Sequence, residues 1–545
     1  MPPMADFNRS RNQTMTHSSP QFHAGRWSTA VFLLLNVSIM LLAIGNDSFW
    51  IDEFWNAYFA SLDSLGSLYQ ALREPYGSQT PLHFVYGYLW AQASPASEFA
   101  LRLSNLPLFV LGQVSLLWAL RDYPKPMAYA MLLVSALHPM VWQYSNEFRP
   151  YIMMYAGAEM LLAYMLHIHA AVEKNRSPSD LGLLIFVVGG ILLFGASLLG
   201  VFWVASACAY VLYFRHRSAP QGNPSARFRL GLVCVFIAIN GLLAVYYINS
   251  LLHGAGGSRL SGPSLSSMIF ALYELLGLSG IGPGRLDLRD AGAASLRSYM
   301  LGLIPVSVVL LTTLAMGVRE AKNALGIRSL VLVLGLGISP VAIVVAAGFS
   351  MHWRFLGRHL IATLPLLNLL FAMGLAKFWS TGSHRFFVRQ VAVPIIFLIA
   401  LTVSSLNLRF ADRHLKEDYQ SASTIAKQEL AAGKRVWWVA DVLGARYYGL
   451  PGEFDYMGEL TNKPKPYQCL DRAGVQSVGD APAECLGKLA APDIVVLSRP
   501  ETFDRNGVIA AYLKAGSFVK VQDLPAFTVW RPPTPADASP MRLRR

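Results

Sequence analysis

Three short stretches of the chain bring acidic and basic side chains together in patterns that suit proton transfer and anion binding. The first is the pair Asp52-Glu53, which follows an apolar run by a few residues. An aspartate within hydrogen-bond reach of a hydroxyl can accept its proton as that oxygen attacks an electrophilic carbon. The adjacent charge of Glu53, with partial burial, would raise the pKa of Asp52 toward that use. The same pair also suits a helix start, with Asp52 as the N-cap and Glu53 stabilised by the helix dipole.

The second stretch is Glu147-Phe-Arg149, which falls between two apolar runs. A carboxylate at such a place can hold a metal ion or a sugar hydroxyl, and a guanidinium can hold a phosphate. The alternative is a solvated turn that ends at Pro150.

The third stretch carries Arg354, Arg358 and His359 at the edge of a later apolar run. The planar guanidinium group binds phosphate through paired N–H groups. Arginines at a membrane interface also extend to lipid headgroups without any such role. His83, His352 and His359 are weaker candidates, because hydrogen-bonded interfacial histidines explain them equally well.

The elements that must position these side chains are membrane helices. Of the 545 residues, 54% are hydrophobic and 14% are charged, and the mean hydropathy is +0.40, which is more apolar than a soluble domain. Uncharged runs approach the thickness of a bilayer core, and they must be helical because unpaired backbone cannot face lipid. The first run lacks a clear cleavage site and is expected to remain as a span. The predicted spans, about eleven, are residues 28–44, 99–120, 127–144, 151–169, 181–195, 198–214, 230–250, 298–317, 329–349, 359–376 and 391–406.

The formal net charge of +13 follows the same topology. With the N-terminus inside, most lysines and arginines fall in cytoplasmic segments, which is the positive-inside pattern. The basic balance therefore needs no nucleic-acid partner. All three candidate stretches, and the chain from residue 407 onward, are then predicted on the opposite face.

Two long external loops interrupt the predicted spans, and long loops tend to be functional. The first carries apolar positions at helical spacing from Phe54 to Leu72, which predicts an amphipathic helix lying on the membrane. A second short helix is predicted from Pro81 to Gln92. The predicted domains are a cytoplasmic tail at 1–27, a membrane domain at 28–406 with external loops at 45–98 and 251–297, an external α/β domain at 407–530 and a disordered tail at 531–545.

The second loop has glycine-rich stretches at 254–258 and 280–284 on either side of an apolar run. This pattern fits a mobile lid, and it fits a surface helix with loose connectors equally well. The apolar run extends from Met268 to Leu278.

The external domain at 407–530 has a sequence pattern typical of a small α/β fold, with a helix predicted at 421–432. Its cysteines, Cys469 and Cys485, are 16 positions apart, so an oxidising compartment could join them, although two unrelated thiols are the alternative. The other two cysteines lie within apolar spans, where they serve as small hydrophobic residues. The predicted strands are 435–440, 493–497 and 527–530.

The order of these motifs resembles that of the C-type, multi-spanning glycosyltransferases. The resemblance is to family 39 and its relatives, which include protein O-mannosyltransferases and the lipid A aminoarabinose transferase. Asp52-Glu53 after the first span is similar to the family's Asp-Glu motif, and the resemblance covers about residues 28–406. Thr80 and His359 stand where the family usually has proline and tyrosine. The other matching segments are Thr80-Pro-Leu-His-Phe84, Glu98-Phe-Ala-Leu-Arg102-Leu, Ser145-Asn-Glu147-Phe-Arg149-Pro-Tyr151 and Arg358 with Pro365.

The resemblance implies an α-helical polytopic membrane protein with the C-type glycosyltransferase fold. It implies inverting sugar transfer from a polyprenyl-phosphate donor in a cavity formed by the external loops. Asp52 would be the general base, Glu53 its neighbour, Glu147 a second acid and Arg358 a phosphate contact. The predicted substrate-binding residues, including Arg354 from its position alone, are His83, Arg102, Arg149, Arg354, Arg358 and His359.

The predicted partners are the polyprenyl-phosphate sugar, membrane lipids and an acceptor that is lipid A or another glycolipid, a polysaccharide or a protein. The expected location is a bacterial inner membrane, with the site and the tail domain in the periplasm. No cofactor is required by the sequence, and a divalent cation remains open. One alternative is a transporter or flippase of lipid-linked saccharides, which would place charges near the bilayer midplane. Another is an O-antigen ligase or polymerase, which gives no reason for an Asp-Glu pair after the first span.

Overall fold

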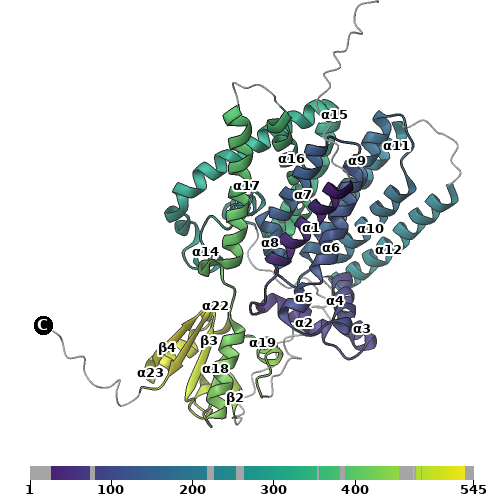
Figure 1. Cartoon of the computed structure of the whole chain (residues 1–545). Helices are drawn as coiled ribbons and strands as arrows, with labels where there is room; N and C mark the ends of the chain where they lie inside the picture. The colour runs from purple at the N-terminus through teal and green to yellow at the C-terminus, as the bar shows by residue number, and fades with distance from the viewer. Residues whose placement is uncertain are drawn as a thin grey trace, which may run out of the picture.

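The computed structural model consists of a helical bundle and, at one end of it, a small domain built on a β-sheet (Figure 1). Arg354, Cys469, the glycines of 254–258 and most of the two predicted terminal tails lie outside the described residues. The described residues are 26–73, 80–217, 226–252, 263–352, 355–380, 387–452, 471, 474–479 and 481–533.

Every predicted span falls on one or two helices of the bundle. Seven of the spans lie on helices long and apolar enough to cross a membrane, and the other four lie on shorter apolar helices. Many side chains on the outside of the bundle are apolar and exposed, such as Leu242 on α12 at 71%, as expected where helices face lipid. The chain is a multi-pass membrane protein. The helices of the bundle are α1 (Arg26–Ala43), α6 (Asn105–Leu120), α7 (Lys125–Leu137), α8 (Pro139–Ser145), α9 (Tyr151–Glu173), α10 (Asp180–Ala196), α11 (Gly200–Arg217), α12 (Ala226–Leu252), α15 (Met300–Met351), α16 (Leu364–Ser380) and α17 (Phe387–Phe410).

Three predicted spans differ in detail from the structure. The third is broken into α7 and α8 at His138, whose backbone is extended at φ −68°, ψ 126°. The residue before a proline avoids the helical region, and Pro139 then starts the new helix. The eighth and ninth spans join in α15, which changes direction at Gly326, where φ is +73°. Only glycine adopts that conformation at little cost.

The first loop contains two surface helices where the sequence predicted one from Phe54 to Leu72. The chain leaves the helical path between α2 (Ile51–Ala60) and α3 (Leu65–Arg73). Ser64 accepts a hydrogen bond from the Ser67 amide, which starts the second helix. The second predicted helix is confirmed as α4 (Pro81–Ala93), with its proline in the first turn. The short α5 (Glu98–Arg102) leads into α6.

The second loop contains α13 (Leu265–Leu275), α14 (Arg285–Ala291) and the 3-10 helix η2 (Gly292–Tyr299). Its second glycine stretch packs against the end of α17. The Gly280 amide donates to Ser404 Oγ at 3.0 Å, and its carbonyl accepts from Asn407 and Arg413. A Cβ at Gly280 would come 1.7 Å from the Ser404 carbonyl oxygen, so glycine here permits close contact with α17.

The C-terminal domain contains a five-stranded sheet in the order β2-β1-β3-β5-β4. The predicted helix and the three predicted strands are confirmed as α18 (Tyr419–Ala431), β1 (Val436–Val439), β3 (Ile494–Ser498) and β5 (Phe527–Arg531). Strands β2, β1 and β3 are parallel, whereas β5 pairs antiparallel with β3 and β4. The elements that the sequence did not predict are β2 (Val475–Ser477), β4 (Val519–Leu524), α19 (Val442–Tyr447), α21 (Ala483–Leu486), α22 (Pro500–Phe503) and α23 (Val508–Ala515).

One face of this sheet shares a hydrophobic core with the first loop. Phe54 of α2 packs edge-on against Tyr419 of α18, with ring centroids 4.9 Å apart. The same core includes Phe148 and Trp438. The other face of the sheet packs against α23 through Ile509 and Leu513. The C-terminal domain is therefore attached directly to the loop that carries the Asp-Glu pair (Figure 1).

Candidate active site

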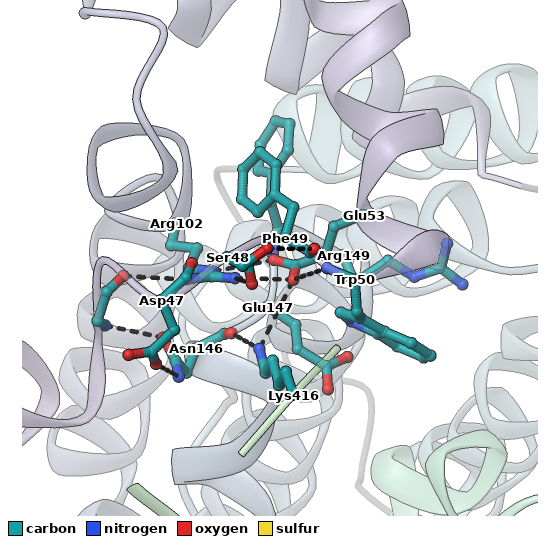
Figure 2. A network of polar contacts seen from close by, with 12 residues as sticks. Asp47, Ser48, Phe49, Trp50, Glu53, Arg102, Asn146, Glu147, Arg149 and Lys416 are labelled. Atoms are coloured by element: carbon teal, nitrogen blue, oxygen red, sulfur yellow. Dashed lines mark hydrogen bonds and ion pairs between the residues drawn. The ribbon is translucent and has the colours of Figure 1, made fainter. Parts of the chain in front are cut away.

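The structure brings the predicted acids and arginines of three separate segments together at the end of the bundle nearest the C-terminal domain. Asp52 and Glu53 come from α2, Glu147 and Arg149 from the turn between α8 and α9, and Arg358 from the 3-10 helix η3 (Gly357–Thr363). Figure 2 shows how Glu53, Glu147 and Arg149 converge with residues of the first loop.

Asp52 faces two arginines. Arg358 Nη1 donates to Asp52 Oδ2 at 3.0 Å, and Arg149 Nη2 lies 3.7 Å from the same oxygen. Arg149 also donates to the Asp52 carbonyl at 2.8 Å. The Asp52 side chain is 29% exposed, so the carboxylate remains accessible to a ligand.

The electrostatics of Asp52 differ from the sequence-based expectation of a raised pKa. Burial alone would raise the pKa of this carboxyl, but the charges of Arg149 and Arg358 outweigh it and hold the pKa below its usual value. Nor does Asp52 cap its helix, because Trp50 is the N-cap residue and Asp52 lies inside the first turn. Glu53 occupies the third helical position, where its carboxylate faces the Trp50 amide at 3.5 Å.

Glu53 is paired with Arg102 in the protein interior. Both side chains are fully buried, with Arg102 Nε and Nη2 at 2.9 and 2.8 Å from the two carboxylate oxygens. The Phe148 amide donates to Glu53 Oε1 at 2.7 Å. Although burial favours the neutral acid, Arg102 and Lys416 keep the pKa of Glu53 below its usual value.

Arg102 uses all of its donors within the protein (Figure 2). Besides Glu53, its guanidinium donates to the carbonyls of Gly45, Asp47 and Ser48. No donor remains for the substrate contact that the sequence predicted. Its contacts fix the backbone of the loop before α2.

Glu147 is also fully buried, and it faces an arginine that the sequence did not single out. Arg285 Nη1 of α14 donates to Glu147 Oε1 at 3.3 Å, while Oε2 has no hydrogen-bond partner within the described part of the protein. Arg285 and Arg358 both lie 5.8 Å from the centre of the Trp50 ring. A cluster of arginines beside an aromatic ring therefore lies near Asp52.

Glu274 is a further buried acid near these arginines. It lies on α13 against Gly357, where a Cβ would come 1.9 Å from Glu274 Oε2. Burial raises the pKa of Glu274 to about 7, opposed by the charges of Arg285 and Arg358. Its signal in the sequence was an acid alone within an apolar run, which is costly unless it is used or paired.

The two predicted histidines lie close to the site. His83 of α4 is buried against the Phe148 ring at 5.5 Å, and burial lowers its pKa to about 3, so the ring is neutral. His359 is half-buried on η3 beside Arg358. His352 has a left-handed backbone at φ +54° and ends α15.

Lys416 was missed, because it stands in the charged sequence Arg413 to Asp418, which is typical of a solvated linker. Its ammonium donates to the Asn146 carbonyl and lies 3.6 Å from Glu53 Oε2 (Figure 2). No local pattern reports that contact, since the partners are hundreds of positions away in the sequence.

A small groove lies within the bundle, and the end of η3 forms part of its wall. Its cavity volume is about 60 Å³, and its lining residues come from α9, α11, α15, α16 and the end of η3. Most of its walls are apolar, and Thr363 at the end of η3 accepts a hydrogen bond from the Trp203 indole at 3.1 Å. Arg358 and Thr363 are the second and last residues of η3, so their backbones lie about 10 Å apart along the helix axis.

No cation site is evident among the described residues. Within them, no three His, Cys, Asp or Glu side chains are grouped so that they could hold a metal ion. The predicted divalent cation therefore has no assigned ligands.

One carboxyl lies inside the bundle, away from this cluster. Glu159 of α9 is fully buried and accepts a hydrogen bond from Gln113 of α6 at 2.7 Å. Gly112 makes room for it, because a Cβ there would come 2.1 Å from Glu159 Oε2. A buried polar pair of this kind joins two helices in an apolar surrounding.

We expect Glu159→Leu to lower the unfolding free energy by about 1–3 kcal/mol, because the Gln113 amide would be left buried without its acceptor. Glu159→Gln keeps an acceptor at the same place and should remain close to wild type. Thermal unfolding in detergent measures both, and equal stability of the leucine variant and wild type would contradict the assignment.

The sequence matches no protein-family profile and no curated protein sequence at a significant level. Solved structures give a clear match in fold. The apo structure of ArnT from Cupriavidus metallidurans aligns with a TM-score of 0.52 at 14% identity, over 92% of this chain and 97% of that one. The structure of the same protein bound to undecaprenyl phosphate aligns with a TM-score of 0.51 at 12% identity, over 94% and 99%.

The protein has the fold of the C-type membrane glycosyltransferases, as the sequence predicted. The likeness extends over the bundle and the C-terminal domain together, since nearly the whole of each chain is aligned.

Proposed function

We propose that the protein is an inverting glycosyltransferase that moves a sugar from a polyprenyl-phosphate donor to a hydroxyl of an acceptor. The observation that carries this proposal is the Asp52 carboxylate, which remains partly exposed and faces Arg149 and Arg358. A base and an anion site in one place, at the end of a bundle of apolar helices, match the parts of a lipid-phosphate sugar. The acceptor is a glycolipid such as lipid A, a polysaccharide or a protein.

The arginine cluster supports a phosphate-linked donor. The Nε groups of Arg149 and Arg358 are buried and have no hydrogen-bond partner within the described part of the chain. Buried cationic donors without partners are costly, and a phosphate would satisfy them. The ArnT structure with undecaprenyl phosphate gives a precedent for such a ligand on this fold.

In the proposed reaction, Asp52 accepts the proton of the acceptor hydroxyl as that oxygen attacks the anomeric carbon. The bond from the anomeric carbon to the phosphate oxygen breaks on the opposite side, and its electron pair stays on the lipid phosphate. Arg149 and Arg358 stabilise the charge that develops there. A phosphate would also draw Arg358 away from Asp52, which frees the carboxylate to act as a base.

The other predicted site residues take supporting roles in this proposal. Glu53 and Arg102 position the loop that carries Asp52, because their charges are buried and mutually satisfied. Glu147 is a second acid that binds a sugar hydroxyl through its free oxygen. His83, His359 and Arg354 remain predicted substrate contacts.

We further propose that the site and the C-terminal domain face the periplasm of a bacterial inner membrane. The distribution of lysine and arginine in the sequence supports this orientation. Cys485 of the C-terminal domain is disulfide-bonded, whereas Cys208 and Cys234 in the bundle are free. Disulfides persist in oxidising compartments such as the periplasm.

The proposal is tested by incubating the purified protein with a panel of polyprenyl-phosphate sugars and candidate acceptors. Release of free lipid phosphate together with a glycosylated acceptor supports transfer. Movement of an intact lipid-linked saccharide across proteoliposomes, without cleavage, would identify a flippase and reject the transferase. A fused reporter after Asn407 that is cytoplasmic would reject the orientation.

Arg358→Gln is expected to lower kcat with a polyprenyl-phosphate donor about 100- to 1,000-fold, because one charged donor to the leaving phosphate is lost. Arg358→Lys should recover only part of the rate, since an ammonium lacks the paired N–H groups. Arg319→Gln, at an exposed position of α15, is the control and should behave as wild type. A wild-type kcat in the Arg358→Gln variant would contradict the phosphate contact.

A further inference from the structure

The segment between α17 and α18 runs along the loop that carries Asp52. It begins with the 3-10 helix η5 (Asp412–His414) and continues through Lys416 and Glu417 into the C-terminal domain. The Ile51 amide donates to Glu417 Oε2 at 3.4 Å, and the Gln420 amide donates to Ser48 Oγ at 3.2 Å. The backbone at the start of α2 is therefore held from the side of the C-terminal domain.

Lys416 of this segment contacts two of the chain segments that form the site. Its side chain is 16% exposed, and its ammonium lies 3.6 Å from Glu53 Oε2 while it donates to the Asn146 carbonyl. Glu53 belongs to the helix of the proposed base, and Asn146 directly precedes Glu147. One cation thus joins the two acidic halves of the site (Figure 2).

A second residue of the C-terminal domain strengthens the same attachment. The Tyr448 hydroxyl accepts a hydrogen bond from the Phe49 amide at 3.0 Å and lies 3.2 Å from Ser48 Oγ. Tyr448 follows α19. These hydrogen bonds therefore hold the loop before α2 against the C-terminal domain.

We propose that Lys416 is a positioning residue, through which the C-terminal domain holds the Asp52 helix and the Glu147 turn in the geometry that sugar transfer requires. That the reaction is sugar transfer rests on the proposed function. The positioning itself rests on the contacts above. Lys416 does not touch the proposed reacting atoms; it acts through Glu53 and the Asn146 carbonyl.

The charge of Lys416 gives this role a pH signature. Two acids, Glu53 of α2 and Glu147 of the turn after α8, face the Lys416 ammonium. Two arginines, Arg102 of α5 and Arg285 of α14, also face it. Glu417 is its neighbour in the chain. Burial lowers the pKa of Lys416 to about 8, although Glu53 opposes this change. The ammonium is therefore present below about pH 8 and is lost as the pH rises through that value.

The test compares Lys416→Met, Lys416→Arg and the control Lys434→Met. Lys434 pairs with Glu429 in the same domain but is 42% exposed and outside the site. Lys416→Met should lower kcat by up to about 100-fold with little change in KM for the donor, because a small displacement of the base has that effect. Lys416→Arg should keep most of the rate and move the alkaline fall in activity to higher pH, because guanidinium stays protonated. Lys434→Met should match wild type.

Hydrogen exchange of the same proteins in detergent separates positioning from activity. Lys416→Met should speed exchange of the amides in residues 48–60 and 144–150, and Lys434→Met should not. Unchanged exchange with unchanged kcat in Lys416→Met would overturn the proposal, as would an alkaline fall in Lys416→Arg at the wild-type pH. A wild-type protein that transfers no sugar would reject the proposed function, while the exchange data would still decide the role of Lys416.

Discussion

Asp52→Asn is expected to lower kcat about 100- to 10,000-fold, the contribution of a positioned general base. Asparagine has nearly the same shape and can still accept a hydrogen bond from Arg358, so binding of the donor should change little. The measurement is the release of lipid phosphate from a polyprenyl-phosphate sugar in the presence of acceptor. The loss should therefore appear in kcat, with a smaller effect on KM.

The pH profile gives a second readout for Asp52. Because Arg149 and Arg358 hold its pKa below the usual value of 3.8, the carboxylate is ionised across the neutral range. The kcat/KM value, which reports the free enzyme, should therefore be lost only as the pH falls through that lowered pKa. Asp63→Asn, at an exposed position of the same loop, is the matched control and should keep wild-type activity. Equal turnover by wild type and Asp52→Asn would end the assignment of Asp52 as the base.

Arg102→Met is expected to destabilise the protein by about 3–5 kcal/mol, because it leaves the Glu53 carboxylate buried without its partner. It also removes the donors to three backbone carbonyls of the loop before α2. Thermal unfolding in detergent, or the half-life at a fixed temperature if unfolding is irreversible, measures the effect.

Lys174→Met is the matched control for an exposed ion pair. Lys174 lies 2.8 Å from Asp122, but its side chain is 47% exposed, and such pairs contribute about 0.2–1 kcal/mol. The double variant Glu53→Gln with Arg102→Met should recover part of the stability, since no charge is then left buried alone. If Arg102→Met and Lys174→Met were equally stable, the buried pair would have no special role in holding the loop.

The sequence by itself determined the membrane architecture. Hydrophobic runs of bilayer length must be helices, so the spans could be read from composition and spacing alone. It also placed Asp52, Glu147 and Arg358 at one end of the bundle, because counting spans assigns each connecting segment to a side. The strands β1 and β3 could be predicted from their apolar runs, because parallel strands are buried on both faces.

Only the tertiary structure decided how the charges are divided among roles. Asp52 and Glu53 are neighbours in the chain, yet Asp52 is partly exposed and faces Arg358, whereas Glu53 is buried against Arg102, since adjacent helical residues point in different directions. The pKa of Asp52 is lowered, against expectation, by arginines that lie 97 and 306 positions away. Lys416 likewise contacts site residues that lie far from it in the sequence. Coulomb interactions depend on distance in space, and a linear sequence records only distance along the chain.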